Sequence, residues 1–337
     1  MHAVILVGGF GTRLRPLTLS KPKQMLPLVG RPMIERVVET LGRQGITEVV
    51  LSLGYRPDQF RSAYPDGRIA GVPVHYAVEP EPLDTAGAIG FAARSAGIAE
   101  TFVAVNGDVL TDLDVAALVA LHRQRGGAGT IALTPVDDPS RYGVVPIDDD
   151  QRVQAFLEKP APGEAPSNWI NAGTYVLEPS VLDRIPSDRK VSIEREVFPR
   201  LVEAGELYAL QSDAYWVDAG TPASYLQAAL DLVSGRRPGP ETEPAVAPSA
   251  RVAAGATLDG SVVSAGSRVD PGAQVVRSLL LDGAVVEAGA SVEDSIVGAG
   301  AVVGAGAVVR DFTIVGDGAA VPPGTKLEGA RFPDADV

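Results

Sequence analysis

The sequence predicts an α/β protein in which a Rossmann-like, mostly parallel sheet is followed by a left-handed β-helix of hexapeptide repeats. Apolar runs alternate with helical patterns up to about residue 235, and from residue 246 an aliphatic residue recurs every five or six positions. A polar, proline-rich segment separates the two patterns. We therefore expect a first domain at residues 1–235, a linker at 236–245, the β-helix at 246–327 and a C-terminal tail at 328–337.

The first domain is expected to build its sheet from five apolar runs. They occupy residues 3–8, 48–54, 72–78, 101–108 and 129–136, and the helical patterns between and after them include residues 32–45, 114–126 and 221–235. Thr221 and Pro222 provide the N-cap and the first position of the last helix. Alternation of strands and helices predicts parallel strands covered on both faces, with ligands at the carboxyl ends of the strands.

The second domain has a regular aliphatic period. Val or Leu recurs at steps of six or five from Val246 to Leu327, and Leu258, Val275, Val292 and Val309 stand at intervals of 17 residues. Three short faces per coil, each with one inward aliphatic residue, are typical of a hexapeptide β-helix.

Such helices often carry acyltransferase sites that use a histidine. The histidines of this chain, His2, His75 and His122, all lie outside the repeats, which disfavours acyl transfer and favours a role in assembly or support. The exposed ends and faces of a solenoid favour a homo-oligomer.

The composition excludes several classes of function. The chain has no cysteine, which excludes disulfides and thiolate catalysis and fits the reducing cytoplasm, where we expect the protein. A formal net charge of −13 argues against a nucleic-acid partner. The sequence shows no leader pattern and no long apolar run, so we expect no membrane partner. Basic residues nevertheless gather at Arg13, Arg15, Lys21 and Lys23, as an anionic ligand would require.

A glycine-rich loop follows the first strand. In VGGFGTRLRP, residues 7–16, the glycines let backbone amides approach phosphate oxygens, and Arg13 adds a planar, permanently charged fork. The loop lacks the GK[ST] ending of a P-loop and the second half of a dinucleotide-binding turn. An arginine over the outer phosphates suits a pyrophosphate leaving group. We therefore predict that the loop holds a nucleoside triphosphate whose α-phosphorus is attacked.

Longer motifs carry a family resemblance over about residues 1–230. LVGGFGTRLRPLTLSKPKQMLPLVGRPMI is followed in order by EPEPLDTAGAI, VNGDVL, YGVV, FLEKP, INAGTYVLEPSVL, SIEREVFP and YWVDAGTPASYL. This series resembles the sugar-nucleotide pyrophosphorylases, nucleotidyltransferases that join an NTP to a sugar 1-phosphate. EPLDTAGAI, INAGTYVL and SIEREVFP are most similar to the mannose-1-phosphate guanylyltransferases, and a C-terminal β-helix also fits the family.

The resemblance implies a role for each motif residue. Arg13, Lys23 and Lys159 are implied to be catalytic, acting on the phosphates by positioning and electrostatics. Asp108 and Asp218 are implied to hold Mg²⁺, which prefers a few hard oxygen ligands. The residues implied to bind the nucleotide are Leu6, Gly8, Gly9, Gly11, Thr12, Arg13, Glu79, Asp84, Thr85 and Gly107. Those implied to bind the sugar are Gly143, Glu158, Lys159 and Asn171.

Glu79 bears on the choice of base. It stands where thymidylyl and uridylyl relatives have Gln. A carboxylate can accept hydrogen bonds from both N1–H and N2–H₂ of guanine, whereas an amide better matches uracil, whose edge presents both a donor and an acceptor. This difference favours GTP. Asp84 stands where guanylyltransferases of this kind commonly have Gly, so it bears on selectivity as well.

Three functions remain open from the sequence. The first is GTP and mannose 1-phosphate giving GDP-mannose and pyrophosphate, by direct Mg²⁺-dependent attack without a covalent enzyme intermediate. The second, within the same family, is a glucose-1-phosphate thymidylyl- or uridylyltransferase or a heptose-1-phosphate guanylyltransferase. The third is a non-catalytic homologue that binds a nucleotide sugar and regulates a partner. Retention of Arg13, Lys23, Asp108 and Asp218 together favours an enzyme.

Overall fold

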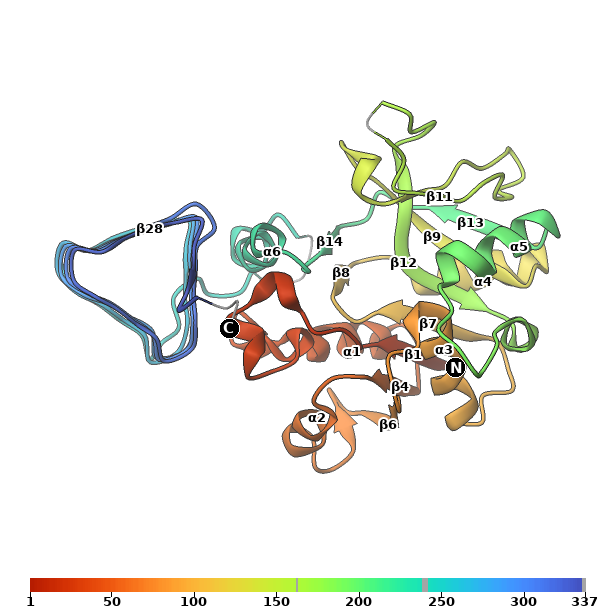
Figure 1. Ribbon diagram of the computed structural model, residues 1–337, viewed down its shortest axis with the longest axis horizontal. Coiled ribbons are helices and arrows are strands. Elements are labelled where there is room, and N and C mark those ends of the chain that lie inside the picture. The colour runs from red at the N-terminus through yellow and green to blue at the C-terminus, as the bar shows by residue number, and fades with distance from the viewer. Residues whose placement is uncertain (162, 238–241, 335–337) are drawn as a thin grey trace. The chain divides into compact units, whose positions relative to one another are not determined.

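The computed structural model describes residues 1–161, 163–237 and 242–334 (Figure 1). The chain forms two compact units, each made of two separate stretches of sequence. Unit 1 comprises Met1–Gly9 and Ile34–Trp216, and unit 2 comprises Phe10–Met33 and Val217–Val337. The expected linker and tail include residues 238–241 and 335–337, which lie outside the described residues.

Unit 1 is built on a ten-stranded sheet. The order is β11-β10-β12-β7-β1-β4-β6-β5, with β9 paired to β12 and β13 paired to β9. The strands are β1 (His2–Leu6), β4 (Glu48–Leu53), β5 (Arg68–Ile69), β6 (Val72–Val78), β7 (Phe102–Asn106), β9 (Gly129–Pro135), β10 (Gly143–Val144), β11 (Leu157–Glu158), β12 (Trp169–Leu177) and β13 (Leu207–Gln211). The predicted α/β sheet is confirmed: β7, β1, β4 and β6 are parallel neighbours, and antiparallel pairs are added around β12.

Helices pack on this sheet, and the apolar core of unit 1 lies between the helices and the strands. Those that lie in or begin unit 1 are α1 (Met33–Arg43), α2 (Pro57–Ala63), α3 (Asp84–Ser95), α4 (Val115–Arg125) and α5 (Phe198–Glu203), preceded by a π-helical turn at Ile193–Val197. The α4 helix begins at Asp114, whose side chain caps Ala117 N, and ends at Gly126 with φ 68°. Buried residues of α3 and the strands, including Ile89, Phe102 and Ile131, form one apolar cluster. No helix within the described ranges is long and apolar enough to cross a bilayer.

A partly buried polar network joins α4 to the sheet. His122 is 2% exposed and lies 2.9 Å from Thr130 Oγ1 through Nδ1 and 2.9 Å from Glu178 Oε1 through Nε2. Thr101 also donates to Glu178 Oε1. Desolvation raises the pKa of Glu178, but the hydrogen bonds from Thr101 and His122 outweigh it and leave the pKa below its ordinary value.

We expect this network to make stability depend on pH. Because the folded-state pKa of Glu178 is lowered, its carboxylate stabilises the fold above the ordinary pKa, and this contribution is lost as the pH falls through the lowered value. Urea midpoints of the wild type and of Glu178→Gln, measured from pH 7 to pH 3, are expected to converge at the acidic end. If the two plots of urea midpoint against pH stayed parallel over the whole range, the stabilising role of the Glu178 carboxylate would be contradicted.

Unit 2 contains a left-handed β-helix of triangular cross-section (Figure 1). Each face is a five-stranded parallel sheet, and successive strands pair at an offset of 17 residues, as Val252 with Val269 and Val275 with Val292. One face has β15 (Arg251–Val252), β18 (Arg268–Val269), β21 (Val285–Val286), β24 (Val302–Val303) and β27 (Ala320–Val321). The second has β16 (Thr257–Asp259), β19 (Gln274–Val276), β22 (Ser291–Glu293), β25 (Val308–Arg310) and β28 (Lys326–Glu328). The third has β17 (Val262–Val263), β20 (Leu279–Leu280), β23 (Ile296–Val297), β26 (Ile314–Val315) and β29 (Arg331–Phe332).

One coil near the C-terminal end of the solenoid is one residue longer than the coils before it. Strands on opposite sides of the extra residue pair at an offset of 18, as Ile296 with Ile314, whereas β26 and β29 pair at an offset of 17 again. The corner taken by Arg277 or Asp294 in earlier coils, each with positive φ, is taken here by two such residues, Asp311 and Phe312. The five-residue steps of the sequence pattern thus mark corners turned by one left-handed residue, and the six-residue step from Val309 to Val315 marks the same corner turned by two.

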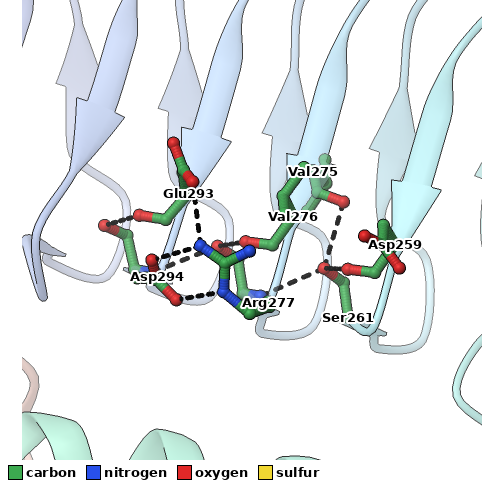
Figure 2. A network of polar contacts seen from close by, with 9 residues as sticks. Asp259, Ser261, Val275, Val276, Arg277, Glu293 and Asp294 are labelled. Atoms are coloured by element: carbon green, nitrogen blue, oxygen red, sulfur yellow. Dashed lines mark hydrogen bonds and ion pairs between the residues drawn. The ribbon is translucent and has the colours of Figure 1, made fainter.

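A polar ladder follows this corner along the solenoid (Figure 2). Ser261 Oγ donates to the Asp259 carbonyl oxygen and accepts from Ser278 N of the next coil. Ser278 repeats both bonds with the Val276 carbonyl oxygen and Ser295 N, and Ser295 Oγ donates to the Glu293 carbonyl oxygen. Outside the ladder, Arg277 forms ion pairs with Asp294 and Glu293. The ladder satisfies buried amides between coils, so this corner is fixed by hydrogen bonds as well as by apolar stacking.

The remaining elements of unit 2 connect to the solenoid. The α6 helix (Pro222–Ser234) begins at Thr221, which forms a capping box with Ser224, as the Thr221–Pro222 pair predicted. α6 packs against β17 and β20. The segment Phe10–Met33 contributes 3₁₀ turns at Thr12–Leu14, Leu17–Leu19 and Lys23–Met25, and a hairpin of β2 (Pro27–Leu28) and β3 (Arg31–Pro32).

Candidate active site

The carboxyl ends of four parallel strands meet at one edge of the unit 1 sheet. Leu6 of β1 pairs with Ser52 of β4 and Asn106 of β7, and Leu53 of β4 pairs with Val78 of β6. The next residues of each chain segment therefore emerge side by side. In this way the structure brings together, at the strand ends, the predicted site residues Leu6, Gly8, Gly9, Glu79, Gly107 and Asp108.

Gly107 makes the turn between β7 and Asp108 tight. Its amide donates to the Leu6 carbonyl oxygen at 2.9 Å, and a Cβ at this position would lie 2.8 Å from that oxygen and 2.8 Å from Val7 Cγ1. No side chain fits there. The turn therefore holds the half-buried Asp108 directly beside the end of β1.

Glu79 is buried at this edge, with 8% of its surface exposed. Ser52 Oγ donates to its Oε1 at 2.8 Å, and Leu83 N donates to its Oε2 at 3.1 Å. A Cβ on Gly8 would lie 3.6 Å from Oε1, so the carboxylate faces the start of the glycine loop. Each carboxylate oxygen can accept a second hydrogen bond, because each has two lone pairs.

Asp84 and Thr85 begin α3 next to Glu79. Asp84 has φ 62°, a left-handed conformation that favours glycine, and this explains physically why glycine is typical at this place. Its Oδ1 accepts from Thr85 N at 2.8 Å. Thr85 Oγ1 donates to Glu194 Oε2 at 2.7 Å and accepts from Ile193 N at 2.8 Å. The Thr85 hydroxyl therefore ties α3 to the SIEREVFP segment.

Three of the predicted sugar residues form a second group on β10 and β11. Gly143 pairs with Glu158, and a Cβ on Gly143 would lie 2.7 Å from the Phe156 ring and 3.1 Å from Glu158 Oε2. Lys159 follows with φ 52°, its side chain 60% exposed and its Nζ 3.4 Å from Glu158 Oε1. The lysine thus stands beside the carboxylate while its ammonium faces solvent.

Asn171 lies on β12, where a bulge interrupts the pairing with β9. Its Oδ1 accepts from Gly173 N, and its Nδ2 donates to Tyr175 OH, whose pKa is raised mainly by burial. Gly173 has φ 74°, and a Cβ there would lie 2.5 Å from Asn106 Nδ2. The bulge therefore brings the Asn171 segment against the end of β7, two residues from Asp108.

Sequence reasoning missed several residues of this edge. Ser52 looked like an ordinary strand residue, and Asn106 and Gly173 were only part of quoted motifs. Trp216 is half-buried and donates from Nε1 to the Ala172 carbonyl oxygen at 2.8 Å. A serine at 52 inside the apolar run EVVLSLG was the one signal that could have been read as a buried polar contact.

Unit 2 carries the other predicted residues. Gly11 has φ 59°, and Thr18 Oγ1 donates to its carbonyl oxygen at 2.8 Å. A Cβ on Gly11 would lie 3.0 Å from Thr18 Cγ2 and 3.2 Å from Lys23 Cβ, so the loop packs closely around this glycine. Thr12 and Arg13 are exposed on the first 3₁₀ turn, above the buried Leu14.

The donor atoms of the two predicted metal ligands suit Mg²⁺. Asp218 stands at the end of β14 (Trp216–Asp218), and its Oδ1 accepts from Gly220 N at 2.9 Å, which orients the carboxylate. Asp108 is oriented by the Gly107 turn. Within the described ranges no three His, Asp or Glu side chains gather into a ready metal cage. Two carboxylates completed by phosphate oxygens and water are a donor set that Mg²⁺ accepts.

The fold and the glycine-bearing strand edge define an α/β protein of the nucleotide-binding class. The family model described as "Nucleotidyl transferase" matches residues 2–235, and the model described as "GMPPB C-terminal domain" matches residues 241–332. The chain therefore belongs to the nucleotidyl transferase family. Members of this family generally use a divalent metal ion.

Curated relatives and a solved structure agree with this assignment. A mannose-1-phosphate guanylyltransferase of Mycobacterium tuberculosis is 43% identical over 272 residues, which are 78% of this chain and 74% of that protein. The mannose-1-phosphate guanylyltransferase catalytic subunit beta of Dictyostelium discoideum is 42% identical, covering 67% of this chain and 63% of that protein. The structure of HddC from Yersinia pseudotuberculosis complexed with GMP-PN matches with a TM-score of 0.59 and 33% identity, over 68% of this chain and 97% of that one.

Proposed function

We propose that the protein is a mannose-1-phosphate guanylyltransferase, which converts GTP and mannose 1-phosphate into GDP-mannose and pyrophosphate. The observation that carries the proposal is the buried Glu79 carboxylate beside the glycine-bearing strand ends. The names of the curated relatives and the GMP-PN complex of HddC support the same substrates. We further propose that the domains divide near residues 236–245, that the enzyme works in the cytoplasm and that it is a homo-oligomer.

The predicted residues divide the chemistry between them. Backbone amides of the glycine loop and the Arg13 guanidinium bind the outer phosphates, and Lys23 neutralises charge that develops at the α-phosphorus. Lys159 binds the phosphate of the incoming sugar, while Glu158, Asn171 and Gly143 position the sugar ring. An oxygen of the sugar phosphate then attacks the α-phosphorus in line, and pyrophosphate leaves.

Asp108 and Asp218 are the residues that would hold Mg²⁺. When bound, the ion supplies charge neutralisation for the phosphates and orients them for in-line displacement. Asp108 belongs to unit 1 and Asp218 to unit 2.

Replacing Glu79 with Gln is expected to narrow the GTP/UTP ratio of kcat/KM by roughly 10- to 100-fold. The Leu83 amide requires an oxygen at the Oε2 position, so the new NH₂ group takes the Oε1 position, where the Ser52 hydroxyl can accept from it. The site would then present one donor and one acceptor, which matches uracil better than guanine. Ser52→Ala, which keeps the carboxylate, serves as the control and is expected to retain the preference for GTP. An unchanged ratio in Glu79→Gln would remove Glu79 from base recognition.

Pyrophosphate release from a panel of NTPs and sugar 1-phosphates tests the function itself. GTP with mannose 1-phosphate is expected to give the highest kcat/KM. A higher value for heptose 1-phosphate, or for glucose 1-phosphate with UTP or dTTP, would favour the alternatives from the same family. No turnover with any pair, together with tight binding of a nucleotide sugar, would favour a regulatory homologue.

A further inference from the structure

We propose that one corner of the β-helix, the Gly316–Asp317 turn, is a positioning platform for the segment that carries Arg13 and Lys23. Both the corner and the segment belong to unit 2. The inference rests on the proposed function, because that function assigns the segment to the nucleotide phosphates.

The first contact of the platform is steric. Pro16 is buried, and a Cβ placed on Gly316 would lie 2.8 Å from Pro16 Cγ and 3.2 Å from Pro16 Cβ. Gly316 is not among the glycines with positive φ, so it is needed here for close approach and not for a left-handed turn. Gly298 lies beneath it in the preceding coil, where a Cβ would come within 2.6 Å of the Gly316 carbonyl carbon and of Asp317 N. The corner is therefore packed from both sides.

The second contact is an ion pair. Lys21 Nζ lies 2.8 Å from Asp317 Oδ2, and each side chain is 26% exposed. Asp317 Oδ1 accepts from Ala299 N of the preceding coil at 2.9 Å. The backbone of the solenoid thus fixes one oxygen of the carboxylate, and the other oxygen meets the lysine. Such a half-buried, oriented pair is stiffer than two mobile surface charges.

The two anchors enclose the part of the segment that shapes the glycine loop. Pro16 and Lys21 stand on either side of Thr18, whose hydroxyl holds the Gly11 carbonyl oxygen. Arg13 precedes the first anchor by three residues, and Lys23 follows the second by two. A shift of either anchor would therefore move both cationic side chains.

A third contact holds the end of the segment. The fully buried Tyr225 of α6 donates from its hydroxyl to the Pro27 carbonyl oxygen. Burial, and after it the negative charge of Asp317, raises the pKa of Tyr225, so the hydroxyl stays protonated as a donor. The platform therefore extends from the corner of the solenoid to the helix that packs on it.

Four variants and one control test the platform. Lys21→Met, Asp317→Asn and the double variant each remove the ion pair, while Lys21→Arg retains the charge. Glu287→Gln is the matched control, because Glu287 also accepts from a backbone amide of a neighbouring coil, Ala305 N at 3.0 Å. We expect kcat/KM for GTP to fall roughly tenfold in the first two variants, since small misplacements of a catalytic group are costly. The double variant is expected to be no worse than either single one, because both remove one interaction.

The accompanying readouts separate positioning from general stability. KM for mannose 1-phosphate is expected to stay within about twofold of the wild type, and Lys21→Arg and Glu287→Gln are expected to retain nearly full kcat/KM. In the substrate-free protein, amide hydrogen exchange of residues 11–19 is expected to quicken in Lys21→Met and Asp317→Asn but not in Glu287→Gln.

The outcomes distinguish the platform from the proposed function. If kcat/KM for GTP in Lys21→Met and Asp317→Asn equalled that of Glu287→Gln, the platform would be refuted, and the proposed function would be unaffected. Absence of turnover by the wild type with every substrate pair would overturn the function, and the exchange comparison alone would then decide the platform: equal exchange in all variants would refute it.

Discussion

Replacing Arg13 with lysine is expected to lower kcat by about 10²–10³-fold, the loss typical of removing one donor that stabilises charge in the transition state. Lysine keeps the positive charge, but it offers a point charge in place of a planar fork that can bridge two phosphate oxygens. The side chain is exposed on its 3₁₀ turn, so the substitution leaves the packing of Leu14 and Leu17 unchanged.

Pyrophosphate release under saturating substrates measures this loss, and the melting temperature reports on folding. Arg68→Lys changes an exposed arginine on β5, which pairs with β6, and it serves as the control. A loss of less than threefold at Arg13 would show that this guanidinium does not touch the transferring phosphates.

Replacing Asp108 or Asp218 with asparagine is expected to lower kcat by roughly 10³-fold and to raise the Mg²⁺ concentration needed for half-maximal activity. Each change keeps an oxygen ligand but removes one negative charge from the set of ligands that hold Mg²⁺. Bound Mg²⁺ stabilises the transition state by several kcal/mol. The double variant is expected to lose little more than either single variant, because both carboxylates are proposed to act through the same ion.

A Mg²⁺ titration of the wild type and of each variant checks this prediction. Asp213→Asn is the control, since Asp213 is exposed five residues before Asp218. If the loss of kcat in the double variant equalled the product of the two single losses, the two carboxylates would act separately, and one of them would not bind the ion.

The β-helix could be predicted from the sequence almost coil by coil. Its signal is local and repeated: Val275, Val292 and Val309 stand 17 residues apart and pair in register in the structure. The strands of the parallel sheet and the cap at Thr221 were equally visible, because apolar runs and capping chemistry act over a few residues. The antiparallel pairing around β12 was less visible, since the partners of β12 lie far away in the sequence.

The geometry of the candidate site could be predicted only in part. Alternating strands and helices predicted a ligand site at the carboxyl ends of the strands, and the structure places Gly8 and Glu79 close together at such an edge. The Ser52 hydrogen bond to Glu79 and the approach of Gly173 to Asn106 depend on side-chain packing across strands, which no local pattern encodes. Asp84 was recognised as unusual, but its left-handed backbone is a property of the folded turn.

The division of the chain into units has a practical consequence for protein engineering. The two family models meet near residue 240, which suggests chimeras that join residues 1–235 of one homologue to the solenoid of another. Residues 10–33 pack within the same unit as residues 217–337, so such a hybrid would place a foreign corner under Pro16 and Lys21. The natural piece to exchange is therefore discontinuous, and a donor solenoid should travel together with the N-terminal segment that it evolved to support.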